Sequence, residues 1–247
     1  MPAAQTFHRK PLPSTCVVFS SIEGRQRFRE ALDSGLAEPF FTLAENFRTQ
    51  DDPAFCGLST LVMVCNALAI DPQRVWKGVW RWFHEDMLNC CKHLKDVRQN
   101  GINLEEFACL ARCNGVEASV TKGVDITLDA FRKLILRCCS EGELVAGFLV
   151  LNYNRAVLGQ TGTGHFSPVA AYHEPTDSVL IMDVARFKYP PHWVAVGTLH
   201  EAIGAHRGLV ILRHGTVGGE GGPALGSSCC ILEGYNVDGT PKHKCEH

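Results

Sequence analysis

The chain has 247 residues, of which 45% are hydrophobic, enough for one globular domain with a substantial core. Its 24 basic and 26 acidic residues leave a net charge of −2, which gives no reason to expect nucleic acid or an anionic membrane as a partner. No apolar run approaches the ~20 residues that span a bilayer, and the first residues lack a secretory signal, so we expect a cytoplasmic protein without a membrane segment.

The first half of the chain shows helical patterns. Ser21 is a candidate cap for a helix over 23–32, which Gly35 would end. An apolar helical stretch covers 58–70 and stops before Pro72. The sequence therefore predicts at least two helices before residue 72.

Two further helices are predicted from cap signals. Asn103 and Glu106 have the spacing of a capping box for a helix over 104–113, and Thr127 is a candidate cap for a helix that reaches Cys138. These signals complete a predominantly helical N-terminal half.

The second half shows strand patterns. Apolar runs cover 144–151, 165–172, 178–184 and 209–212, and a short helix is expected near 199–203. The turn residues at 173–177 predict an antiparallel hairpin. Helices followed by strands predict an α+β fold with a helical lobe, an antiparallel sheet lobe and an active site between them.

The glycine run at 218–222 interrupts these patterns. We therefore expect a catalytic domain over 1–215 and a glycine- and cysteine-containing tail over 216–247, either flexible or the remnant of a reduced C-terminal region.

Cys56 directly precedes the apolar helical stretch. A helix N-terminus offers unpaired N–H groups and a positive dipole end, so we expect a lowered thiol pKa and a nucleophilic thiolate. The alternative is that Cys56 is a core residue, which is the commoner role for a single cysteine before a helix.

Three more residues support the nucleophile interpretation. His165 would take the thiol proton, Asp183 would orient the imidazole, and Gln50 with the Cys56 N–H would hold an oxyanion. Gly164, beside His165, would let a substrate backbone approach. The order Gln, Cys, His, Asp is typical of a papain-like cysteine acyltransferase.

The sequence resembles the phytochelatin synthases, the glutathione γ-glutamylcysteinyltransferases of the papain-like clan, over about residues 7–214. The matching stretches are RKPLPS at 9–14, FF at 40–41, TQ at 49–50, PAFCGL at 53–58, NALAIDP at 66–72, WKGVWRWF at 76–83, MLNCC at 87–91, QTGTGHFSP at 160–168 and DVARFKYPPHW at 183–193.

The resemblance implies a Cys56–His165–Asp183 triad with Gln50 in the oxyanion hole. It implies that the γ-Glu-Cys unit of glutathione is transferred, with release of glycine, to another glutathione or a phytochelatin. The product chelates heavy metals and serves their detoxification. No cofactor is required. Cadmium, zinc or copper ions would act as activators, as glutathione thiolates, and a homodimer is compatible with the resemblance.

Other residues have both functional and structural interpretations. Arg186 could bind a glutathione carboxylate or be a surface cation. Arg207 matches the family position for donor substrate, and Lys188 and Tyr189 could line an acceptor site. His192 is interpreted as structural or exposed.

Twelve cysteines are many for this length. Without a secretory signal we expect reduced thiols rather than a disulfide scaffold. Cys109 and Cys113 are one helical turn apart and could bind a soft metal with Cys90 and Cys91, which occur at family-like positions. The alternative for Cys109 is packing as a small apolar residue.

Two alternatives to transpeptidation stay open. Short bacterial relatives, which this domain also resembles, mainly hydrolyse glutathione to γ-Glu-Cys and glycine. The cysteine content would also suit a thiol-rich metal-binding protein without catalytic turnover.

Overall fold

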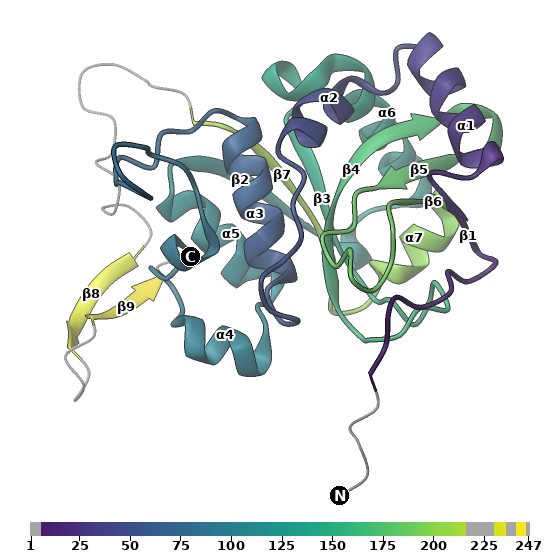
Figure 1. The fold of residues 1–247 in the computed structure, drawn as a ribbon. Helices are drawn as coiled ribbons and strands as arrows, with labels where there is room; N and C mark the ends of the chain where they lie inside the picture. Colours follow the sequence, from purple (N-terminus) through teal and green to yellow (C-terminus); the bar gives the residue numbers. More distant parts are fainter. Residues whose placement is uncertain (1–5, 216–229, 236–240, 246–247) are drawn as a thin grey trace, which may run out of the picture.

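The computed structural model describes residues 6–215, 230–235 and 241–245 (Figure 1). The helices are α1 (Ile22–Asp33), α2 (Glu38–Glu45), α3 (Cys56–Ala67), α4 (Leu94–Asn100), α5 (Leu104–Cys113), α6 (Leu128–Val145) and α7 (Val196–Ala202), with short 3-10 turns η1 (Glu85–Met87), η2 (Gly123–Asp125) and η3 (Glu174–Thr176). The strands are β1 (Cys16–Val18), β2 (Val116–Lys122), β3 (Phe148–Tyr153), β4 (His165–His173), β5 (Ser178–Ile181), β6 (His192–Ala195), β7 (Gly208–His214), β8 (Cys230–Tyr235) and β9 (Pro241–Cys245).

The main sheet has the strand order β1-β6-β5-β4-β3-β7-β2, and every neighbouring pair is antiparallel. Figure 1 shows α3 and α5 beside the β2–β7 end, with α1 and α7 toward the β1–β6 end. β3 and β4 therefore occupy the middle of the sheet, where strands are covered by helices.

The sheet separates two hydrophobic cores, and alternate side chains enter each. Phe148 and Val150 of β3 pack into the core that contains the apolar residues of α3 and α5. Leu149 and Leu151 point to the opposite face, into the core that contains α6 and α7. The helices therefore cover both faces of the sheet.

The predicted helix starts at Ser21 and Asn103 are confirmed. The Ser21 hydroxyl accepts a hydrogen bond from the Gly24 N–H at 2.9 Å. Asn103 and Glu106 form the complete capping box, in which each side chain accepts the other's backbone N–H at 2.8 Å.

The predicted α+β fold is confirmed, with differences in its elements. The apolar run at 144–151 was expected to be one strand, but α6 continues to Val145 and β3 begins at Phe148. Gly147 separates them at φ +82°, where a Cβ would lie 2.6 Å from the Leu212 carbonyl oxygen. The sequence patterns also missed α2, α4, β1, β2 and β6, which are short or lie between longer elements.

The residues expected to form a tail include one described pair of strands, because β8 and β9 pair in antiparallel fashion. The remaining positions of 216–247 lie outside the described residues. The boundary at 215 therefore stays a prediction. Among the described helices, none has both the length and the apolar character that crossing a bilayer requires.

Candidate active site

Cys56 is the first residue of α3, and its side chain is half-buried. The turn before it is held by Asp52, whose carboxylate accepts the Ala54 N–H at 3.0 Å and whose carbonyl accepts the Phe55 N–H at 2.9 Å. The residue before α3, Phe55, has no side chain that could accept a hydrogen bond from the first N–H groups of the helix, so these groups are not capped locally.

Tight packing brings this helix start onto the first residues of β4. A Cβ on Gly57 would lie 2.5 Å from the Ile102 side chain and 3.2 Å from the Phe166 ring. The Thr60 hydroxyl donates to the Phe166 carbonyl at 3.2 Å. The Phe166 backbone in turn forms a hydrogen bond with the Cys56 sulfur, so the thiol lies against the residue that follows His165.

His165 opens β4, and Asp183 follows β5; both side chains are buried. Their contact joins His165 Nε2 to Asp183 Oδ1 at 2.7 Å. Because an ionised carboxylate only accepts, Nε2 carries the proton and Nδ1 is the basic nitrogen. The structure thus joins two of the predicted site residues, His165 and Asp183, and places Cys56 against Phe166, the residue after His165.

Asp183 is held by further contacts that the sequence analysis missed. Its Oδ2 accepts from Arg155 at 2.7 Å, and its Oδ1 also accepts the Ala185 N–H at 2.8 Å. Arg155, which is only 2% exposed, also donates to Gln160, whose amide contacts His192 Nε2 at 2.9 Å. This buried chain of partners fixes the carboxylate in one orientation.

Weak signals in the sequence pointed to these partners. Arg155 is a charged residue that closely follows a continuous apolar run, and Gln160 opens the glycine-containing segment before His165. Neither signal identifies Asp183 as the partner, because the contact spans 28 positions. His192, predicted to be structural or exposed, is fully buried.

Charges and burial together set the protonation of the pair. Burial alone would raise the pKa of Asp183, but His165 and Arg155 outweigh it and hold that pKa well below its usual range. Burial, assisted by the Arg155 charge, lowers the pKa of His165 from 6.5 to about 4, against the opposing effect of Asp183. His165 is therefore a neutral base near pH 7.

The expected lowering of the Cys56 pKa is wrong. Burial raises the pKa of the thiol above 9.0, and the Phe166 N–H, the Arg155 charge and the Gly57 N–H only partly offset it. The helix terminus acts in the predicted direction, but desolvation is the larger effect. Near pH 7 Cys56 is thus a neutral thiol and His165 a neutral imidazole.

Gln50 lies beside the catalytic loop but does not present a free donor. Its backbone N–H donates to the Val184 carbonyl at 3.0 Å, next to Asp183. Its side-chain amide donates to the carbonyls of Asp52 at 2.8 Å and Pro53 at 3.0 Å. An oxyanion contact would require one of these bonds to be exchanged, so the predicted role of Gln50 stays a prediction.

Arg207 approaches the site over Gly164. A Cβ on Gly164 would lie 2.8 Å from the Arg207 Nη1, so the glycine makes room for the guanidinium. Burial lowers the pKa of Arg207, and a negative charge on Cys56 would oppose this shift. Arg207 also borders a surface cavity of about 440 Å³ together with Leu104, Glu105, Lys122, Val124, Ala205 and His206.

The other predicted substrate residues have different surroundings. The Tyr189 side chain is buried, and its hydroxyl accepts the Thr161 N–H at 3.0 Å. Lys188 donates to the Thr161 carbonyl at 2.6 Å, so both residues hold the segment that precedes His165. Arg186 is exposed and stacks on Phe47 at 4.8 Å.

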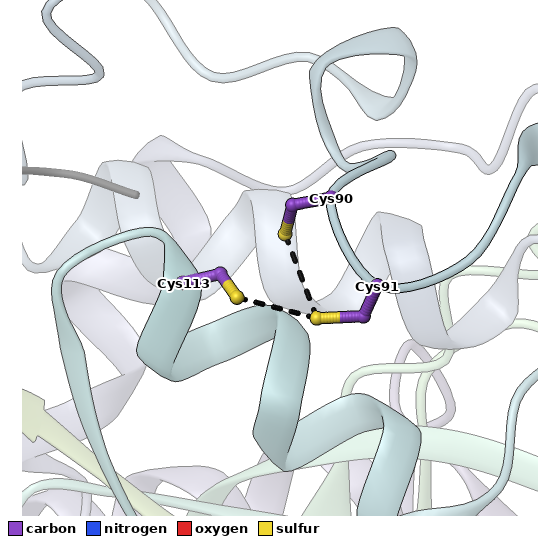
Figure 2. Close-up of side chains that lie close together, drawn as sticks. All are labelled: Cys90, Cys91 and Cys113. Atoms are coloured by element: carbon purple, nitrogen blue, oxygen red, sulfur yellow. Dashed lines mark hydrogen bonds between the residues drawn. The ribbon is translucent and has the colours of Figure 1, made fainter. Parts of the chain in front are cut away.

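The four predicted metal-site cysteines also lie together. Figure 2 shows the sulfurs of Cys90, Cys91 and Cys113 pointing toward one another. Cys91 forms a disulfide with Cys109, which differs from the expected fully reduced chain. The positions of the four cysteines in the sequence pointed to the cluster but not to the Cys91–Cys109 bond within it.

Comparisons with known proteins agree on one family. The family model for phytochelatin synthase matches residues 7–208. The chain is 45% identical over 218 residues to the glutathione gamma-glutamylcysteinyltransferase of Schizosaccharomyces pombe, covering 85% of this chain and 51% of that protein. It is equally similar to glutathione gamma-glutamylcysteinyltransferase 1 of Arabidopsis thaliana, at 45% identity over 218 residues, 85% of this chain and 44% of that one.

The chain spans about half the length of the curated relatives it matches. Among solved structures, a double glycine motif protease from an AMS/PCAT transporter, in complex with the leader peptide, matches with a TM-score of 0.43 at 15% identity. That match covers 67% of this chain and 89% of the other.

Proposed function

Because the chain belongs to the phytochelatin synthase family, we propose that it is a cysteine transpeptidase that makes phytochelatins from glutathione. One observation carries the proposal: the Cys56 sulfur lies against the first residues of β4, where His165 is hydrogen-bonded to Asp183. A thiol beside an oriented base is the arrangement that acyl transfer requires.

The first half-reaction forms an acyl enzyme. His165 Nδ1 takes the Cys56 proton as the sulfur attacks the carbonyl carbon of the Cys–Gly amide. The N–H groups at the start of α3 stabilise the oxyanion, with Gln50 if its amide turns from the loop carbonyls. The imidazolium then gives its proton to the departing glycine amine, and a γ-Glu-Cys thioester remains on Cys56.

The second half-reaction reverses these roles. His165 takes a proton from the α-amino group of a second glutathione or of a phytochelatin. That nitrogen attacks the thioester carbonyl, the new peptide bond forms, and the proton returns to the Cys56 sulfur. Asp183, held ionised by Arg155, stabilises the imidazolium in both halves.

Substrate binding requires cations, since glutathione carries two carboxylates. Arg207 lies at the site over Gly164 and reaches the cavity that Lys122 also lines. We propose that Arg207 binds a carboxylate of the donor. Arg186 is exposed and Lys188 is half-buried, and both are candidates for binding the acceptor. The buried Tyr189 ring lies 5.9 Å from the Lys188 Nζ.

Heavy-metal ions enter this proposal as part of the substrate. A cadmium, zinc or copper ion bound by glutathione thiolates would be delivered with the acceptor, so the ion does not polarise the scissile carbonyl. We place the activity in the cytoplasm, where thiols are kept reduced.

The test is to incubate the full chain with glutathione, with and without cadmium, and to identify thiol peptides by mass spectrometry. The proposal expects (γ-Glu-Cys)n-Gly oligomers that increase with cadmium, and their loss in Cys56→Ala. γ-Glu-Cys and glycine without oligomers would indicate a hydrolase. Cadmium binding without glycine release would indicate a non-catalytic thiol protein.

A further inference from the structure

Four cysteine sulfurs from two segments converge in one small volume. Cys90 and Cys91 lie between η1 and α4, and Cys109 and Cys113 are one turn apart on α5. The sulfurs of Cys90 and Cys91 are 3.7 Å apart, those of Cys91 and Cys113 are 3.2 Å apart, and Cys109 is bonded to Cys91. This set is the four-cysteine cluster (Figure 2 shows three of its members).

These separations suit a tetrahedral metal–thiolate site. With metal–sulfur bonds of about 2.3 Å, tetrahedral geometry places sulfurs about 3.8 Å apart. The sulfurs of Cys90, Cys91 and Cys113 all lie within 4.8 Å of one another, so small rotations of the side chains reach that geometry.

The surroundings favour thiolates and admit an ion. Arg74 donates to Asn114 at 3.0 Å, and the Asn114 amide contacts the Cys90 sulfur at 3.9 Å, so a positive charge lies near the cluster. Cys90, Cys91 and Cys113 are each half-buried rather than sealed in the core, which leaves an entry path.

We propose that the four-cysteine cluster, when reduced, binds one soft metal ion through four thiolates, and that the Cys91–Cys109 disulfide is its metal-free alternative. The two states exclude each other because a sulfur in the disulfide cannot also be a thiolate ligand. Zn²⁺ and Cd²⁺ are the chemical class that such a site takes.

The exchange between the two states balances. Two molecules of a low-molecular-weight thiol, R–SH, give two electrons and two protons to the Cys91–Cys109 bond and leave as R–S–S–R. The metal ion then displaces one proton from each of the four thiols. Oxidation runs in reverse, with R–S–S–R as the oxidant.

The cluster joins the segment after η1 to α5, and α5 reaches the active site. Phe107 of α5 stacks on Phe166 with ring centroids 4.7 Å apart, and Phe166 follows His165. The metal site does not rest on the proposed function, since it would be present in a chain that makes no peptide.

The experiment measures binding rather than turnover. The full chain carries Cys56→Ala, to remove the nucleophile, and serine in place of Cys229, Cys230 and Cys245. It is reduced with a phosphine, desalted without oxygen and titrated with Cd²⁺ alone. Native mass spectrometry counts bound ions, and ultraviolet sulfur-to-cadmium charge transfer reports the ligands.

The proposal expects one ion per reduced chain. It expects Cys90→Ala and Cys113→Ala each to weaken binding about tenfold or more, because even the loss of an outer partner costs this much at metal sites. Cys138→Ala is the matched control, since Cys138 also has an adjacent cysteine but lies buried in the other core. It should bind as the parent does.

Two results would overturn the proposal. One is unchanged Cd²⁺ affinity in Cys90→Ala and Cys113→Ala that are folded by circular dichroism. The other is equal Cd²⁺ binding by the reduced chain and by the chain with its Cys91–Cys109 disulfide intact, since the two states would then not exclude each other.

Discussion

Arg155 is a buried cation in the active site, and its charge affects the pKa values of both Asp183 and His165. It is nearly inaccessible, contacts Asp183 directly, and packs over the Tyr189 ring at 5.3 Å. Its charge keeps Asp183 ionised and, together with burial, lowers the pKa of His165. It therefore acts as a positioning residue that sets the proton affinity of the base without touching substrate.

Arg155→Gln is expected to move the acid limb of kcat/KM to higher pH. In the parent, His165 has a pKa of about 4, so activity should fall only as the pH approaches that value. Removing the Arg155 charge raises the pKa of His165, and we expect a shift of roughly one pH unit. The measurement is a pH profile of kcat/KM for glutathione on protein whose folding is verified by circular dichroism.

Arg155→Lys is the matched control, because it keeps the positive charge but loses the planar fork. Its acid limb should stay near that of the parent, even if kcat falls. An Arg155→Gln profile that loses height but keeps its acid limb would show that Arg155 only maintains structure.

At the scale of elements, α5 supports both the active site and the four-cysteine cluster. Phe107 and Leu110 pack into the core that also contains residues of β3 and β7. Cys109 and Cys113 contact Cys91 in the segment after η1. The capping box at Asn103 determines where this helix starts. The placement of both sites therefore depends on a local signal at one helix end.

Asn103→Ala should lower the free energy of unfolding by about 1 kcal/mol, because it removes the acceptor for the Glu106 N–H and breaks the reciprocal pair. Thr127→Ala at the start of α6 is the comparison, since its bond to the Ala130 N–H is longer, at 3.3 Å. Urea unfolding monitored by circular dichroism measures both. An equal or larger loss in Thr127→Ala would contradict this ranking.

For the whole molecule, two buried groups give opposite dependences of stability on pH. The folded-state pKa of His165, about 4, is below its ordinary 6.5, so between these values the unfolded chain binds more protons and acidification destabilises. Burial raises the pKa of Glu85 from 4.5 to about 7, only partly opposed by Arg48, so acidification through that range stabilises. Each shift is worth about 3 kcal/mol.

We therefore expect Glu85 to offset much of the destabilisation that acid causes in the parent between about pH 7 and 4.5, and Glu85→Gln to remove this offset. That variant should lose roughly 2–3 kcal/mol across the same interval, because the His165 contribution is no longer offset. His192, whose pKa is also lowered by burial, adds in the same direction as His165.

Urea unfolding at several pH values measures this, and Glu85→Gln combined with His165→Gln is the control, in which most of the slope should disappear. A Glu85→Gln chain that stays as insensitive to acid as the parent would contradict the opposing contributions.

Features that depend on neighbouring residues could be predicted from the sequence. Ser21 and Asn103 start helices through side-chain bonds to N–H groups three positions away, and the turn after His173 joins β4 to β5. The sequence also placed Cys56 at a helix start, His165 at the start of a strand and Asp183 just after one. These features depend on interactions between residues a few positions apart, so they can be predicted from local patterns.

Features that depend on contacts between distant segments could not be predicted from local patterns and required the folded arrangement. The Arg155–Asp183 contact, the Cys91–Cys109 disulfide and the use of the Gln50 amide by loop carbonyls each need a particular packing. The pKa of Cys56 is raised rather than lowered as predicted, for the same reason. A helix terminus lowers it in any exposed setting, but desolvation by the surrounding core is larger, and no local pattern specifies how deeply a side chain is buried.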